Sequence, residues 1–125
     1  MTKKTVLAIG LDPVHVDFAA MPGLTPDLVR RFIDAEIERV RAAGFDVVSC
    51  LTDLGETAEQ TVRAALDDQA FDCVVFGAGM RTPPERLLLF ETILNLIHER
   101  APGARIAFNS SPSDTADAVL RWIEP

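Results

Sequence analysis

The chain has 125 residues, of which 48% are hydrophobic and 25% are charged, and its formal net charge is -7. This length and composition are typical of a single globular domain, here residues 1–125. The negative charge, without any stripe of Lys and Arg, argues against binding to nucleic acid. Apolar runs such as residues 87–90 are too short to cross a bilayer, so we expect a cytoplasmic protein without membrane contact.

Short β-branched runs alternate with longer helical periods, which is typical of βαβ units around a parallel sheet. The first run, residues 5–11, follows two lysines like a signal peptide, but Asp12 and Pro13 interrupt it, so we interpret it as a strand. Further strands are predicted at residues 46–51, 73–77 and 105–109. Right-handed crossovers then give about four parallel strands in the order 2-1-3-4, in a three-layer α/β/α sandwich that is flavodoxin-like or Rossmann-like.

Capping residues indicate where the helices begin. The first helix is predicted from Thr25 as N-cap to just before Gly44, and the second opens at Thr57 in a capping-box pattern. A second capping box at Thr82 predicts the third helix from residue 83 to about residue 100. The fourth helix is predicted from residue 111 to the end of the sequence, with Ser111 as its N-cap.

The predicted topology places any ligand site at one edge of the sheet. In open parallel sheets, ligands bind beyond the carboxyl ends of the strands where the strand order reverses, here between the first and third strands. The loops that should meet there are residues 11–24, 78–82 and 109–111. The first of these loops is longer than the usual two to six residues, so it is either functional or an elaborate packing element.

His15 lies between two carboxylates, Asp12 and Asp17, in the first loop. A histidine flanked in this way is suited to act as a general base near neutral pH, so His15 and Asp12 are the candidate catalytic residues. The alternative is a surface loop in which His15 faces water. No nucleophile is paired with these residues in the sequence, so whether the chain is an enzyme stays open.

Gly77, Gly79 and Arg81 follow the third strand, and Asn109 and Ser110 follow the fourth. Glycines allow a ligand to approach the backbone, and an arginine can bind a carboxylate or phosphate through two hydrogen bonds. We therefore predict a small anionic or nucleotide-like ligand, held by these five residues. The alternative is a glycine turn beside a solvated arginine.

Several specific activities are excluded by missing residues. A dinucleotide-binding loop needs G-x-G-x-x-G after the first strand, where this chain has Gly10-Leu11-Asp12-Pro13. The sheet resembles the phosphoacceptor domains of two-component signalling in outline, but it lacks their acidic pair and the aspartate after the third strand. No serine has the G-x-S-x-G context of a hydrolase.

Metal and cofactor sites are not expected either. The two histidines, His15 and His98, fall on separate elements, and His98 is interpreted as a structural residue within a helix. Cys50 and Cys73 form no C-x-x-C pair and lie in apolar runs, so we expect them to pack as small hydrophobic residues.

Three segments carry a resemblance to known sequences: LTDLGETAE at residues 51–59, FDCVVFGAG at residues 71–79 and FNSSP at residues 108–112. They resemble short hypothetical proteins of bacteria and fungi that are Rossmann-like or flavodoxin-like. No activity is known for that group, so the resemblance implies a stand-alone Rossmann-like domain and nothing about a substrate.

A second hypothesis is a homodimeric interaction module without catalytic activity. Leu88 falls outside the wide apolar arc of the third helix, which suggests a surface for a partner. A four-stranded sheet also leaves edge strands that a two-fold partner could cover. A ligand site and a homodimer are compatible with each other.

Overall fold

The sheet is parallel throughout, and its strand order is the predicted one. The computed structural model describes residues 3–16, 18–19 and 21–125. In this part of the chain β1 (Thr5–Leu11), β2 (Asp46–Thr52), β3 (Cys73–Phe76) and β4 (Arg105–Phe108) form one four-stranded sheet in the order β2-β1-β3-β4. The fold is therefore the flavodoxin-like or Rossmann-like α/β architecture that the alternation of segments predicts.

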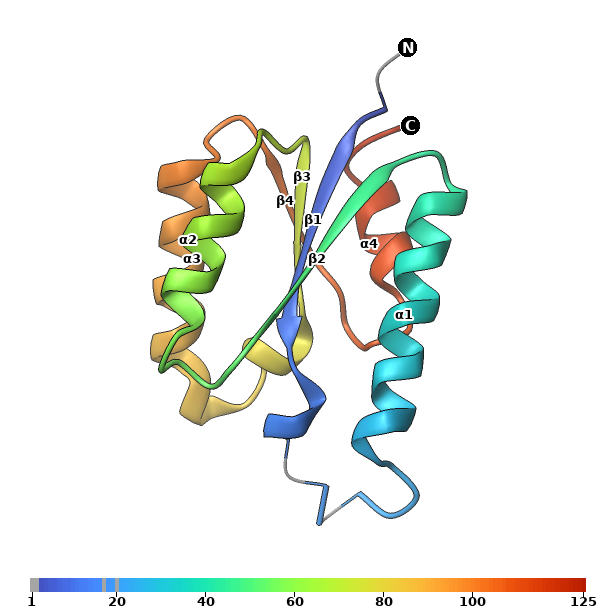
Figure 1. The fold of residues 1–125 in the computed structure, drawn as a ribbon, viewed down its shortest axis with the longest axis vertical. Helices are drawn as coiled ribbons and strands as arrows, with labels where there is room; N and C mark the ends of the chain where they lie inside the picture. The colour runs from blue at the N-terminus through green and yellow to red at the C-terminus, as the bar shows by residue number, and fades with distance from the viewer. Residues whose placement is uncertain (1–2, 17, 20) are drawn as a thin grey trace.

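Helices cover both faces of the sheet, as Figure 1 shows. On one face lie α1 (Pro26–Ala42) and α4 (Thr115–Leu120), and on the other lie α2 (Ala58–Asp68) and α3 (Leu87–Arg100). Successive residues of β1 supply the two cores, because side chains alternate along a strand: Val6 and Ala8 pack towards α1 and α4, whereas Leu7 and Ile9 pack towards α2 and α3. None of the helices in the described residues is both long and apolar enough to span a membrane.

The boundaries of α1 are those predicted from its caps. Thr25 Oγ1 accepts a hydrogen bond from the N–H of Leu28 at 3.1 Å, and Pro26 is the first helical residue. Gly44, just beyond the helix, has a φ of 110°, a conformation that side chains with a Cβ rarely adopt.

The capping predictions for α2 and α3 are wrong in detail. The Thr57 hydroxyl makes no cap to its helix and instead donates to Asp53 Oδ2 at 2.6 Å. The Thr82 hydroxyl donates to the carbonyl of Ala78 at 3.1 Å and caps no helix; the segment after it is a separate 3-10 turn, η3 (Pro84–Arg86), and α3 begins at Leu87. Pro84 disfavours the helical conformation at the residue before it, and Pro83 accordingly has an extended ψ of 130°.

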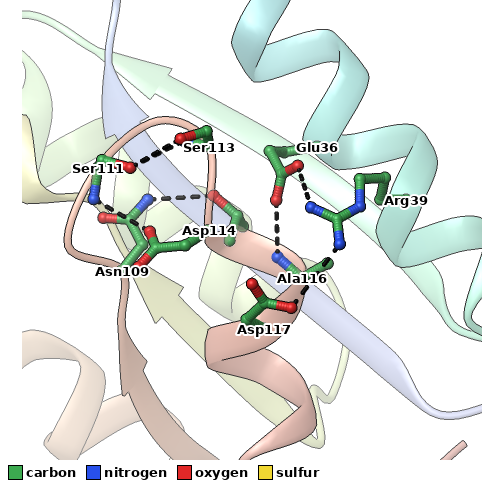
Figure 2. Close-up of polar contacts among 9 residues, drawn as sticks. Glu36, Arg39, Asn109, Ser111, Ser113, Asp114, Ala116 and Asp117 are labelled. Carbon is green, nitrogen blue, oxygen red and sulfur yellow. Dashed lines mark hydrogen bonds and ion pairs between the residues drawn. The ribbon is translucent and has the colours of Figure 1, made fainter.

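The start of α4 is also corrected, from residue 111 to Thr115. Asp114, rather than Ser111, organises this turn, because its carboxylate accepts hydrogen bonds from the N–H groups of Ser110 and Ser111 at 2.9 Å and 3.0 Å. Ser111 Oγ instead lies 3.0 Å from Ser113 Oγ (Figure 2). A carboxylate that accepts several amide hydrogens stabilises the turn more strongly than a serine cap would.

Candidate functional site

A cavity of about 300 Å³ lies at the carboxyl edge of the sheet, on the face covered by α1 and α4. In Figure 1 this edge is at the lower end of the strands, where the loop after β1 and the 3-10 turn η2 (Ala78–Met80) meet. The floor is formed by residues from the middle to the carboxyl end of β1, β2 and β3 and by residues that follow β3 and β4. These floor residues are Ala8, Gly10, Ser49, Leu51, Val75, Gly77 and Asn109.

Glycines leave room at this floor. A Cβ placed on Gly10 would have only Leu51 Cδ2 within 4 Å, at 3.6 Å, so this position opens into the cavity. At Gly77 a Cβ would come within 3.1 Å of the carbonyl oxygen of Ile9, so glycine is needed there for the close approach of the two strand ends. Gly79 also lines the cavity, beside Leu11. The glycine turn therefore shapes the floor of the cavity.

The remaining walls of the cavity are apolar. Helix α1 contributes one wall, and the long loop after β1 contributes the mouth. The apolar side chains that line these parts are Val29, Ile33 and Ile37 from α1 and Val16, Phe18, Met21 and Leu24 from the loop. Among the described residues, no charged side chain lines the cavity. Such a lining disfavours a ligand that would bury a charge and favours a ligand with an apolar surface.

Asn109 and Thr115 provide the polar end of the cavity. Both line it, and both are buried, with 9% and 7% of their surface exposed. Asn109 Oδ1 accepts a hydrogen bond from the N–H of Ala78 at 2.7 Å, and its Nδ2 donates to Thr115 Oγ1 at 3.1 Å. The backbone donor fixes which way the amide points, so Asn109 holds the end of β4 against η2 and the start of α4.

Arg81 points its charge at the backbone and does not line the cavity. Its Nε donates to the carbonyl of Phe76 at 3.1 Å, and its Nη2 donates to the carbonyl of Asn109. The guanidinium also lies over the ring of Phe108, 4.7 Å from its centre. Burial lowers the pKa of Arg81, although the charge of Asp114 opposes this. The side chain joins the ends of β3 and β4.

His15 and Asp12 lie apart from the cavity lining. Asp12 Oδ1 accepts hydrogen bonds from the N–H of Val14 at 3.1 Å and from Arg30 Nη2 at 2.6 Å. His15, in the 3-10 turn η1 (Pro13–His15), is exposed. Asp17, its other predicted neighbour, lies outside the described residues. A general-base role for His15 is thus not supported by any contact in the described part of the chain.

Ser110 is likewise engaged outside the cavity. Its hydroxyl and its N–H both donate to the carboxylate of Asp114. Of the residues predicted to bind a ligand, the structure therefore brings Gly77, Gly79 and Asn109 together around the cavity. It places Arg81 and Ser110 in the backbone connections behind it.

Sequence reasoning missed Glu36, which is only 5% exposed. Its Oε1 accepts a hydrogen bond from the N–H of Ala116 at 3.1 Å, and its Oε2 accepts one from Arg39 Nη1 at 2.8 Å (Figure 2). The available signal in the sequence was a glutamate at helical spacing from two apolar residues of α1, Ile33 and Val40. Glu36 connects α1 to α4 beside the cavity.

Other reactive groups give no second site. In the described residues, no group of three or more His, Cys, Asp or Glu side chains is arranged to hold a metal ion. Cys50 and Cys73 are free and buried. Burial, with a smaller effect of Asp72, raises the pKa of Cys73 to about 11, which disfavours the reactive thiolate.

Comparison with known proteins adds no assignment, since no protein-family model and no curated protein matches the chain. Membership of the group of short Rossmann-like proteins therefore stays a prediction from the three resembling segments. The fold and the cavity are what support a function.

Proposed function

We propose that the protein binds a small organic molecule in the cavity at the carboxyl edge of its sheet. The observation that carries this proposal is the cavity itself, about 300 Å³ in volume and lined by apolar side chains and glycines. It lies beside the ends of β1 and β3, where the strand order reverses and where open α/β sheets bind their ligands. Its size and lining are those of a small-molecule site.

The lining favours an uncharged ligand over the anionic or nucleotide-like one predicted from the sequence. Moving an anion out of water without a nearby cation is costly. The cation predicted from the sequence to bind the ligand, Arg81, is directed at two backbone carbonyls instead. An anionic ligand would therefore have to keep its charge at the solvent-exposed mouth.

The proposed role is binding rather than catalysis. The hydroxyl-bearing side chains of the lining are Ser49 and Thr115, and no histidine or carboxylate among the described residues lines the cavity beside them. A hydroxyl without an adjacent base is a weak nucleophile. The cavity thus offers shape and hydrogen bonds, but no acid and base pair.

A thermal-shift and calorimetry panel tests the proposal, with acetophenone and ethylbenzene as neutral probes and AMP and inorganic phosphate as anions. We expect the neutral probes to raise the melting temperature and the anions to leave it unchanged. Gly10→Ala should fold normally, because its Cβ has room. It should lower the affinity for the neutral probes by about tenfold, since the added methyl group occupies space at the floor of the cavity.

Gly103→Ala is the matched control, because a Cβ at that position would meet nothing within 4 Å and lies away from the cavity lining. Equal affinity in both variants would contradict binding at this floor. A response to the anions alone would contradict the uncharged ligand.

A second candidate, the homodimer, is favoured by the unequal edges of the sheet. The β4 edge is short, and Arg121 Nη2 donates to the carbonyl of Phe108 there at 2.8 Å. The β2 edge is a seven-residue strand without proline or glycine, charged only at Asp46, and its Val48 is 37% exposed. An edge of this length with a single charge at its start is suited to pairing with a second copy. Light scattering after size exclusion measures whether that pairing occurs.

A further inference from the structure

We infer that the ligand carries an uncharged oxygen acceptor, such as a ketone, that binds the Thr115 hydroxyl and the Asn109 amide. This inference rests on the proposed function, because it concerns the polar end of the same cavity. It narrows the ligand class from any small neutral molecule to one with an apolar body and a carbonyl at one end.

Thr115 and Asn109 each have a hydrogen atom that is free to donate to a ligand. Thr115 Oγ1 accepts a hydrogen bond from Asn109 Nδ2, so its own hydrogen is left to donate, and no acceptor for it is found among the described residues. Asn109 Nδ2 has a second hydrogen, which likewise has no acceptor in the described part of the chain, whereas one of the two lone pairs of Oδ1 accepts the N–H of Ala78. The polar end of the cavity therefore presents two hydrogens without an acceptor, and one ligand oxygen can accept both.

The surroundings of the pair select a neutral acceptor. Two carboxylates lie close to Thr115: Asp114 precedes it in the chain, and Glu36 accepts the N–H of Ala116, which follows it. Arg39 pairs with Glu36 and Arg121 lies near Asp114, but neither arginine lines the cavity, so an anionic oxygen there would have no cation of its own among the described residues. Glu36 also occupies the amide of Ala116, which could otherwise have bound an anion. A carbonyl oxygen needs no cation and keeps the hydrogen bonds.

Probes matched in size separate this inference from binding as such. Acetophenone, ethylbenzene and benzoate share a ring and a short substituent, but they offer a neutral acceptor, no acceptor and an anion. We expect the protein to bind acetophenone about three- to tenfold more tightly than ethylbenzene, which is the effect of one net hydrogen bond. Benzoate should bind most weakly of the three.

Variants of Thr115 test the residue. Thr115→Val removes the hydroxyl at nearly constant volume and should reduce the preference for acetophenone, because one of the two donors is lost, while leaving the affinity for ethylbenzene. Thr115→Ser keeps the hydroxyl and should keep the full preference. Thr61→Val is the control, because the Thr61 hydroxyl bonds to the carbonyl of Thr57 on the exposed side of α2. The comparison uses a ratio of two affinities in one protein, so a general loss of stability cancels.

The three probes separate a failure of the inference from a failure of the proposed function. Equal affinities for acetophenone and ethylbenzene in the unmodified protein would overturn the inference and leave the proposed function intact, even if Thr115→Val failed to fold. Tightest binding of benzoate would overturn it in favour of an anion. Failure of both neutral probes to bind would overturn the proposed function and the inference together.

Discussion

The carboxylate of Glu36 on α1 accepts a hydrogen bond from the backbone N–H of Ala116 on α4, at 3.1 Å and in a buried position. The second oxygen of the same carboxylate accepts a hydrogen bond from Arg39. Figure 2 shows this acid between the two helices. Because α1 lines the cavity and α4 begins at its polar end, the bond fixes two walls relative to each other.

Replacing Glu36 should therefore destabilise the fold. Glu36→Ala leaves the Ala116 N–H without its acceptor and should lower the free energy of unfolding by about 1–3 kcal/mol. Glu36→Gln retains one acceptor oxygen and should cost less. Glu38→Ala, which removes an exposed pair with Arg41, should change stability by less than about 1 kcal/mol. Urea denaturation of the three variants provides the ranking, and equal losses for Glu36→Ala and Glu38→Ala would refute it.

Arg81 is expected to act in stability rather than in anion binding. Arg81→Met removes hydrogen bonds to the carbonyls of Phe76 and Asn109 and should lower the free energy of unfolding by about 1–3 kcal/mol. Neither the variant nor the unmodified protein should respond to phosphate or AMP. Arg41→Met is a control on an exposed arginine. Measured anion binding that disappears in Arg81→Met without a loss of stability would support the ligand role predicted from the sequence.

Asp53 should titrate at an unusually low pH. Hydrogen bonds from the Thr57 side chain and the Gly55 backbone lower the pKa of Asp53 from 3.8 to about 2. Since the folded pKa is depressed, the stabilisation by Asp53 is complete above about pH 4 and is lost as the pH falls through 2. Carboxyl NMR titration should show this low midpoint, rising in Thr57→Val and staying low in Thr57→Ser. A midpoint near 3.8 in the unmodified protein would contradict the hydrogen-bonded turn.

The homodimer proposal predicts that a charge on the β2 edge prevents assembly. Val48→Lys places an ammonium group in the middle of the β2 edge, where the strand has no charge, and should yield a monomer of 13.6 kDa by light scattering. Leu88→Lys on α3, where the leucine is 78% exposed, should leave a β2-paired dimer intact. Dissociation by Leu88→Lys alone would move the interface to α3, and a monomeric unmodified protein at high concentration would remove the homodimer altogether.

The sheet could be predicted because each of its signals is local and repeated. Apolar runs give the strands, and the rule for crossover handedness then gives the order, which the structure confirms. The limits of α1 followed from Thr25 and Gly44, whose capping roles depend only on near neighbours. The loops that line the cavity could also be predicted, because each follows a predicted strand and the carboxyl ends of parallel strands share one edge of the sheet.

What could not be predicted depends on partners distant in the sequence. Arg81 had a suitable loop position for a ligand, but its carbonyl partner on Asn109 is 28 residues away. Glu36 bonds across 80 residues to Ala116, which no periodicity within α1 reveals. Competing local bonds also mattered, since Asp114 replaced Ser111 at the start of α4. Local patterns determine elements, whereas these long-range bonds determine which side chains face the cavity.

The most direct test of the central claim, that the cavity is a binding site for a small neutral molecule, is a methyl NMR titration of the protein with acetophenone. We predict saturable shifts for the methyl groups of Ile33, Leu51 and Val75, which line the cavity, and none for Leu87 and Leu88 on the opposite helical layer. Shifts confined to Leu87 and Leu88, with Ile33 and Val75 unmoved at saturation, would contradict it.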